Sequence, residues 1–199
     1  MALKIICIGD SITGENNLKL YNKWSNLLQL MLEGNKGIGN AAVLNWGIGG
    51  NSSADLLDRL DLSQEKPKPD IVILLIGGND RNPSLGMTPE MTRKNLNRII
   101  DRIQRCCEKI LMLEYHVLPF PDHPEKAWTH LAKSNPMIEE VAKQRNLPSL
   151  HMGHVMEQAS RHYSLDELVN PDDSVHLRPA GEITYAKAIY GKIRELGWI

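Results

Sequence analysis

The chain has 199 residues, of which 42% are hydrophobic and 24% are charged, and its net charge is -1. This length suits one domain with a substantial core, and the composition is ordinary for a globular protein. The near-neutral charge gives no reason to expect nucleic acid or an anionic membrane surface as a partner. No apolar run approaches the ~20 residues of a membrane span.

The cysteines and the start of the chain bear on location. Two of the three cysteines, Cys106 and Cys107, are adjacent, and an odd count with adjacent residues does not resemble a disulfide framework. The first apolar run begins only four residues into the chain, which leaves no room for a signal peptide. These features predict a cytoplasmic protein with reduced thiols.

Short apolar segments alternate with helical patterns along the chain. Five segments are expected to be strands: residues 5–8, 41–46, 71–76, 110–115 and 147–151. Apolar spacing of i, i+3 and i+4 predicts helices over 24–32, after 51–53, over 88–103, over 128–141, near Val155 and after Pro179. Residues 164–174 are expected to form a polar loop. The alternation predicts one α/β domain over residues 1–199, a three-layer α/β/α sandwich with a five-stranded parallel sheet, flavodoxin-like.

The first strand ends abruptly at Gly9-Asp10-Ser11. A serine at the carboxyl end of a parallel strand lies where such folds bind ligands, beside the turns that follow the other strands. Taken alone, Ser11 is more typical of a helix N-cap than of a nucleophile. Serine becomes a nucleophile only when a base accepts its proton, so the rest of the chain must supply one.

Among seven histidines, His176 has the most suitable context, because it lies in a polar loop immediately before the last helix. Asp173, three residues earlier, can accept the ring N–H and fix the tautomer, which leaves the other nitrogen for Ser11. Asp172 is the competing acid. The spacing therefore predicts a Ser-His-Asp triad.

The developing oxyanion of such a reaction needs hydrogen-bond donors that are already in place. Gly50 can offer its backbone N–H because no side chain blocks the approach. Asn79 can offer its side-chain amide, and Ser11 can offer its own N–H. All three residues follow predicted strands.

Four blocks of the sequence resemble those of the SGNH (GDSL-type) hydrolases and occur in that family's order: residues 9–11, 45–50, 77–80 and 173–176. The resemblance implies Ser11 as nucleophile, His176 as base and Asp173 as the acid that orients it. It also implies Gly50 and Asn79 as oxyanion donors beside the Ser11 N–H, with no metal or cofactor. The chain departs from the family pattern at Ile12, where leucine is usual, and at Gly78, where threonine is common.

The expected function is that of a serine hydrolase that cleaves carboxylic esters of small or medium acyl groups through an acyl-enzyme on Ser11. O-acetylated carbohydrates are among the candidate substrates, and the loops after Asn79 and over 115–128 are expected to form the substrate pockets. The partner is a small-molecule ester, and the sequence leaves the oligomeric state open. The same site also suits a lysophospholipase, a thioesterase or an acyltransferase. A non-catalytic α/β binding module, in which Ser11 caps a helix around an anion, is the alternative of another class.

Other polar residues are given structural roles. His123 and His130 with Asp122 form at most a weak metal pair, because no ligand spacing is present. Asp10 and Asp80 are expected to hold their own turns. Arg81 is more typical of a solvated loop charge than of a substrate contact.

Overall fold

A five-stranded parallel sheet forms the centre of the molecule. In the computed structural model, which describes residues 2–14, 22–35, 37–116, 118 and 133–199, the strand order is β2-β1-β3-β4-β5. The strands are β1 (Leu3–Gly9), β2 (Ala41–Gly47), β3 (Ile71–Leu75), β4 (Ile110–Glu114) and β5 (Ser149–His151). All neighbours pair in parallel. The predicted α/β fold class and its five strands are confirmed.

Burial explains the positions of the strands. The apolar residues of β3 and β4 are buried on both faces, which is the pattern of strands covered by helices on each side. By contrast, β5 is only half-buried and follows Pro148, and proline is tolerated at the start of an edge strand. The central strands therefore supply the core and β5 closes one edge.

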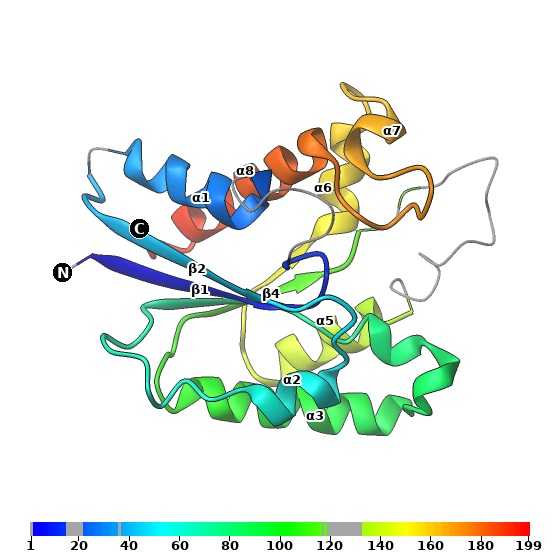
Figure 1. Cartoon of the computed structure of the whole chain (residues 1–199). Helices are drawn as coiled ribbons and strands as arrows, with labels where there is room; N and C mark the ends of the chain where they lie inside the picture. The colour runs from blue at the N-terminus through cyan, green and yellow to red at the C-terminus, as the bar shows by residue number, and fades with distance from the viewer. Residues whose placement is uncertain (1, 15–21, 36, 117, 119–132) are drawn as a thin grey trace.

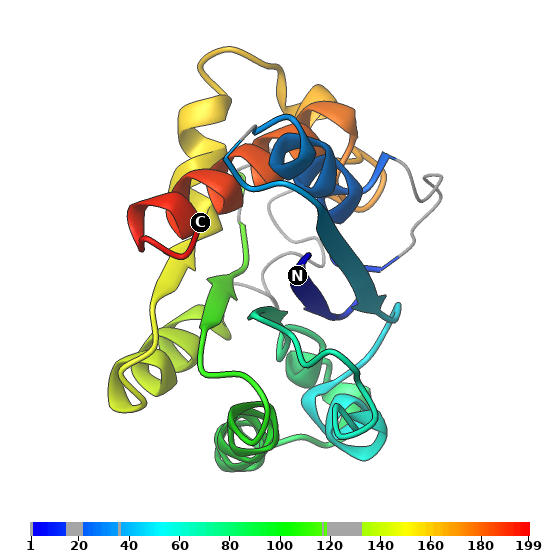
Figure 2. The ribbon, with the colours of Figure 1, turned by 90° about the vertical axis from the view of Figure 1, so that its left-hand side faces the viewer.

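Two layers of helices cover the sheet (Figures 1 and 2). The first layer contains α1 (Trp24–Glu33), α6 (Met152–Ala159), α7 (Leu165–Leu168) and α8 (Pro179–Glu195). The second contains α2 (Ser53–Arg59), α3 (Pro89–Gln104) and α5 (Asn135–Gln144). Two short 3-10 turns, η2 (Asn79–Arg81) and η3 (Pro83–Leu85), follow β3. No helix among the described residues has the length and apolar character to cross a membrane.

The helix starts follow their capping residues. The Thr88 hydroxyl accepts a hydrogen bond from Met91 N, and Pro89 occupies the first turn of α3, as the sequence predicts. The expected loop over 164–174 is partly wrong, because α7 lies within it. Ser164 and Glu167 form a capping box that stabilises this single turn.

The helix expected over 128–141 is described only in part. In the structure α5 begins at Asn135, and residues 128–132 lie outside the described part of the chain.

Parallel pairing brings the strand carboxyl ends to one edge of the sheet. Gly9 is in register with Gly47 of β2 and with Leu75 of β3. The turns after these three strands therefore start at the same level, although they are far apart in sequence. This edge holds the candidate site.

Candidate active site

Ser11, His176 and Asp173 form a continuous chain of hydrogen bonds at the carboxyl edge of the sheet. His176 Nε2 lies 3.0 Å from Ser11 Oγ, and His176 Nδ1 lies 2.8 Å from Asp173 Oδ2. The carboxylate only accepts, so Nδ1 carries the proton and Nε2 is free to accept one from Ser11. This arrangement allows the imidazole to act as a general base toward the serine hydroxyl.

The loop that carries both Asp173 and His176 is held in shape by hydrogen bonds to the Asp173 carboxylate. Asp173 Oδ1 accepts hydrogen bonds from Val175 N at 2.8 Å and His176 N at 2.9 Å. Burial raises the pKa of Asp173, but the hydrogen bonds from His176 and Val175 outweigh burial and lower that pKa below its ordinary value. Asp173 is therefore ionised near neutral pH. The competing residue Asp172 is exposed and bonds through its N–H to Asn170.

The turn that presents Ser11 is short. Gly14 N donates to Asp10 O at 2.7 Å, and Ile12 N donates to Asp10 Oδ1 at 2.9 Å. Residues 11–14 form turns and a bend, so no α-helix starts at Ser11. The turn packs tightly on β2, where a Cβ on Gly47 would lie 2.2 Å from Gly14 N. Only glycine allows this approach.

Asp10 connects the serine turn to the loop after β3. Its Oδ2 accepts a hydrogen bond from the Tyr115 hydroxyl, which in turn accepts one from Gly78 N at 3.0 Å. Burial raises the pKa of Asp10 to about 6, although the bonds from Tyr115 and Ile12 act in the opposite direction. Asp10 has the structural role expected of it, over a longer range than its own turn. Tyr115 was not predicted.

The raised pKa of Asp10 gives stability a defined pH dependence. A carboxyl group whose folded pKa lies above its unfolded value stabilises the fold fully below that unfolded value, and this contribution is lost as pH rises through the folded pKa. As pH rises from 3.8, the ordinary pKa, to about 6, the pKa in the folded protein, the free energy of unfolding of wild type should fall by about 3 kcal/mol relative to that of Asp10→Asn. Urea unfolding of both proteins from pH 4 to pH 7 measures the difference. A difference that stays constant with pH would contradict this prediction.

Gly50 and Asn79 lie at the turns after β2 and β3. The turn over 48–51 is closed by Asn51 N donating to Ile48 O at 3.2 Å, and Gly50 has a φ of +75°, a value that glycine adopts without strain. Within the described residues, Gly50 N–H has no hydrogen-bond partner. Asn79 Nδ2 donates to Asn51 O at 3.0 Å, which fixes the amide and leaves its second N–H for a ligand.

Arg59 supports the same edge and was missed in the sequence. Its Nε donates to Asn51 Oδ1 at 2.7 Å, and one terminal nitrogen donates to Trp46 O at 2.8 Å and Gly9 O at 3.2 Å. One guanidinium at the end of α2 therefore ties the ends of β1 and β2 to the loop that bears Gly50. Cations are common in the last turn of a helix, so the position of Arg59 in the sequence did not indicate these contacts.

Asp80 and Arg81, in the loop after β3, contact residues of other segments. Asp80 does not hold its own loop, because its carboxylate accepts hydrogen bonds from the backbone and hydroxyl of Ser53 at the start of α2. Arg81 donates to the Lys133 carbonyl at 3.2 Å.

Asp122, His123 and His130, with most of the loop expected to shape the substrate pockets, lie outside the described residues. Within the described ranges, no group of three or more His, Cys, Asp or Glu side chains is placed to hold a metal ion.

With this geometry established, comparison with known proteins identifies the family. The model of the GDSL-like Lipase/Acylhydrolase family matches residues 7–182, which includes every residue of the site. The chain belongs to this family. The match confirms the family resemblance found in the sequence.

Individual relatives agree with that assignment. The chain is 26% identical over 117 residues to an arylesterase from Vibrio mimicus, a match that covers 58% of the chain and 56% of the relative. It is 31% identical over 118 residues to the esterase TesA of Pseudomonas aeruginosa, with 59% and 57% covered. The match therefore spans somewhat more than half the length of these curated relatives. The structure of a lipase/acylhydrolase from Enterococcus faecalis superposes with a TM-score of 0.79 at 25% identity, over 98% of this chain and 97% of the other.

Proposed function

We propose that this GDSL-family chain hydrolyses carboxylic esters through a covalent acyl-enzyme on Ser11. The observation that carries the proposal is the hydrogen-bonded sequence Ser11–His176–Asp173. His176 takes the Ser11 proton as Oγ attacks the ester carbonyl, then gives that proton to the departing alcohol. Water activated by the same nitrogen attacks the acyl-enzyme, and the acid leaves with Ser11 restored.

The oxyanion formed in each step is held by donors from three turns. The Ser11 N–H, the Gly50 N–H and the Asn79 amide take this role in the proposal. Donors that are fixed before the reaction stabilise the transition state without reorganisation. The bond from Asn79 to Asn51 and the turn at Gly50 support such a fixed arrangement.

The proposed substrates are esters of small or medium acyl groups. The names of the two curated relatives, an arylesterase and an esterase, support ester hydrolysis but do not define an acyl length. The partner is a small-molecule ester, and the cytoplasmic location stays a prediction. Hydrolysis of p-nitrophenyl esters with acyl chains from acetate to palmitate tests the proposal. A maximum at short or medium chains with kcat/KM falling beyond it is expected, whereas no hydrolysis at any length would contradict it.

Loss of one oxyanion donor gives a separate prediction. Asn79→Ala is expected to lower kcat by about 10²–10³-fold, because the amide stabilises charge that develops only in the transition state. KM should change little. Steady-state kinetics on p-nitrophenyl acetate measures both constants.

The matched control for this variant is Asn97→Ala on α3, which removes an amide that donates to Arg93 O. It should keep the wild-type kcat. Equal activity of wild type and Asn79→Ala would remove Asn79 from the proposed oxyanion hole.

A further inference from the structure

Both the proposed base and its acid depend on one short loop. This loop, residues 170–177, is closed by an isolated bridge between Val169 and Leu177. Within it, Ser174 has a φ of +58°, the left-handed region that non-glycine residues adopt only when their surroundings hold them there. The position of His176 therefore depends on what anchors the loop to the rest of the molecule.

His116 provides such an anchor from the sheet. It follows β4 directly after Tyr115 and is buried, and its Nε2 lies 2.9 Å from Val175 O. Val175 stands between Ser174 and the proposed base. The bond therefore joins the end of β4 to the middle of the catalytic loop.

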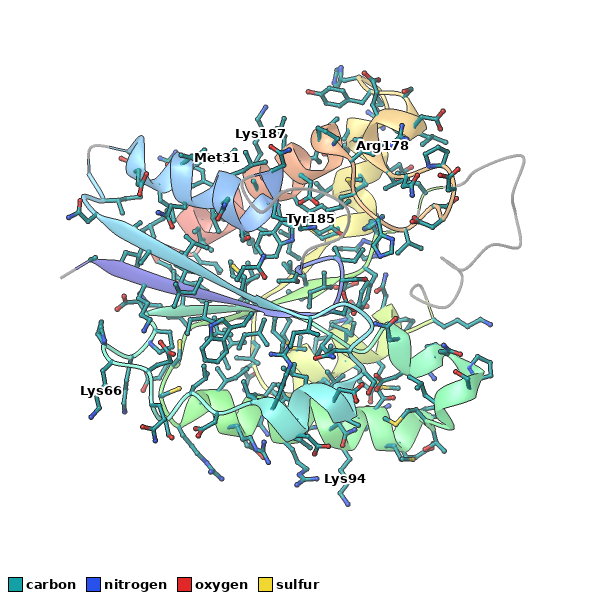
Figure 3. The ribbon with its side chains drawn as sticks, in the orientation of Figure 1. Met31, Lys66, Lys94, Arg178, Tyr185 and Lys187 are labelled. Atoms are coloured by element: carbon teal, nitrogen blue, oxygen red, sulfur yellow. The ribbon has the colours of Figure 1, made fainter. Side chains whose placement is uncertain are left out.

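Tyr185 holds the other side of the His116 ring. The Tyr185 hydroxyl lies 2.5 Å from His116 Nδ1, and the two rings are perpendicular with centroids 5.5 Å apart. Tyr185 is buried on α8 and extends toward the sheet, whereas Lys187 of the same helix extends away from it (Figure 3). The loop, the sheet and α8 are thus connected through one imidazole.

The partners of His116 define its tautomer and charge. A carbonyl oxygen only accepts, so Nε2 carries the hydrogen, and Nδ1 accepts from the Tyr185 hydroxyl. Burial lowers the pKa of His116 to about 4, against the bond to Val175, so the ring is neutral near pH 7. A neutral donor in a fixed orientation suits a positioning role.

We propose that His116, oriented by Tyr185, is a positioning residue that holds the loop bearing Asp173 and His176 in register with Ser11. The inference rests on the proposed function, because it assigns a support to that same triad. Displacement of a catalytic group by about 1 Å can lower a rate about 10²-fold. Removal of the support should therefore reduce kcat more than it affects KM.

Tyr185→Phe tests the orientation of His116, and Tyr190→Phe is its matched control. Tyr190 lies on the same helix, and its hydroxyl accepts a hydrogen bond from Asn35 Nδ2 at 3.1 Å, so both variants lose one hydroxyl contact. Tyr185→Phe is expected to lower kcat about 10-fold with KM within about twofold of wild type. Tyr190→Phe should keep the wild-type kcat.

Two variants at His116 separate its two bonds. In His116→Gln the amide nitrogen can still donate to Val175 O, whereas the shorter His116→Asn places its amide near Tyr185 and leaves Val175 O without a donor. The glutamine variant should therefore retain a higher kcat than the asparagine variant.

Proton NMR gives a second readout for the tyrosine variants. The downfield resonance of the proton on His176 Nδ1 should shift in Tyr185→Phe and stay unchanged in Tyr190→Phe.

The outcomes distinguish the two proposals. If wild type does not react at Ser11 with an organophosphonate, the proposed function fails and this inference fails with it. If wild type reacts but Tyr185→Phe keeps both its kcat and its His176 resonance, only the positioning role is overturned. An equal loss of kcat in Tyr185→Phe and Tyr190→Phe would also overturn it, because the effect would then come from loosening of α8.

Discussion

Ser11→Ala is expected to lower kcat for p-nitrophenyl esters by about 10⁴–10⁶-fold while the fold stays intact. Alanine removes the Oγ atom that is proposed to form the acyl-enzyme, and His176 then has no hydroxyl at 3.0 Å from which to take a proton. Residual hydrolysis would come from water and the proposed oxyanion donors. Steady-state and single-turnover kinetics at saturating substrate measure the loss.

The matched control for this substitution is Ser160→Ala. Ser160 follows α6, away from the candidate site, and its hydroxyl donates to Glu157 O at 2.7 Å, so its loss should leave kcat unchanged. Thermal unfolding of both variants checks that the fold is retained. If Ser11→Ala kept near-wild-type activity, the proposed nucleophile would be wrong.

Asp173→Asn is expected to lower kcat by about 10⁴-fold at neutral pH. Asp173 Oδ1 accepts two backbone N–H bonds, from Val175 and His176, so the asparagine oxygen must stay at that position. The amide nitrogen then faces His176 Nδ1, where wild type has an accepting oxygen. Because the amide can only donate there, it favours the tautomer with the proton on Nε2, which cannot accept a proton from Ser11.

The neighbouring acid is a stringent control for this prediction. Asp172→Asn changes the same charge one residue earlier, and Asp172 is exposed and does not bond to His176. Its kcat should stay within about twofold of wild type, since surface substitutions usually have small effects. A large loss for Asp172→Asn with little loss for Asp173→Asn would reverse the assignment of the acid.

The fold was largely predictable because its central strands are unambiguous. The run 71–76 is long enough for a buried strand, too short for a helix and rich in β-branched residues. Parallel pairing places its carboxyl end at the same edge of the sheet as Gly9, and Leu75 is the residue in register with Gly9. The turn α7 was missed because four residues give no helical periodicity, although the Ser164–Glu167 capping box was present as a signal.

The proposed catalytic residues were also accessible from the sequence, because each follows a strand or precedes a helix within a short motif. The residues that support them were not. Tyr115 reaches Asp10 across 105 positions, and His116 reaches Tyr185 across 69. Such contacts depend on how distant elements pack, which local patterns do not encode. The signal in the sequence was weak. It consisted of Tyr115 and His116, two consecutive side chains with polar ends directly after a buried strand.

A buried ion pair illustrates the same limit. Lys23 Nζ lies 2.7 Å from Glu182 Oε1, and Trp24 N donates to Glu182 Oε2 at 2.7 Å, although the residues are almost 160 positions apart. Trp24 also donates from Nε1 to Ile12 O at 3.1 Å, next to Ser11. Through these bonds the helix after His176 is joined to the turn of the proposed nucleophile. Nothing in the local sequence around Lys23 predicts this partner.

Covalent labelling of the wild-type chain by an organophosphonate, followed by intact mass and peptide mapping, tests directly whether Ser11 is the nucleophile. One adduct per chain is expected, on Ser11, with none in Ser11→Ala and a much slower reaction in Asp173→Asn. Labelling is also expected to abolish ester hydrolysis. A chain that hydrolyses esters yet stays unlabelled, or carries the adduct on another residue, would show that Ser11 is not the nucleophile.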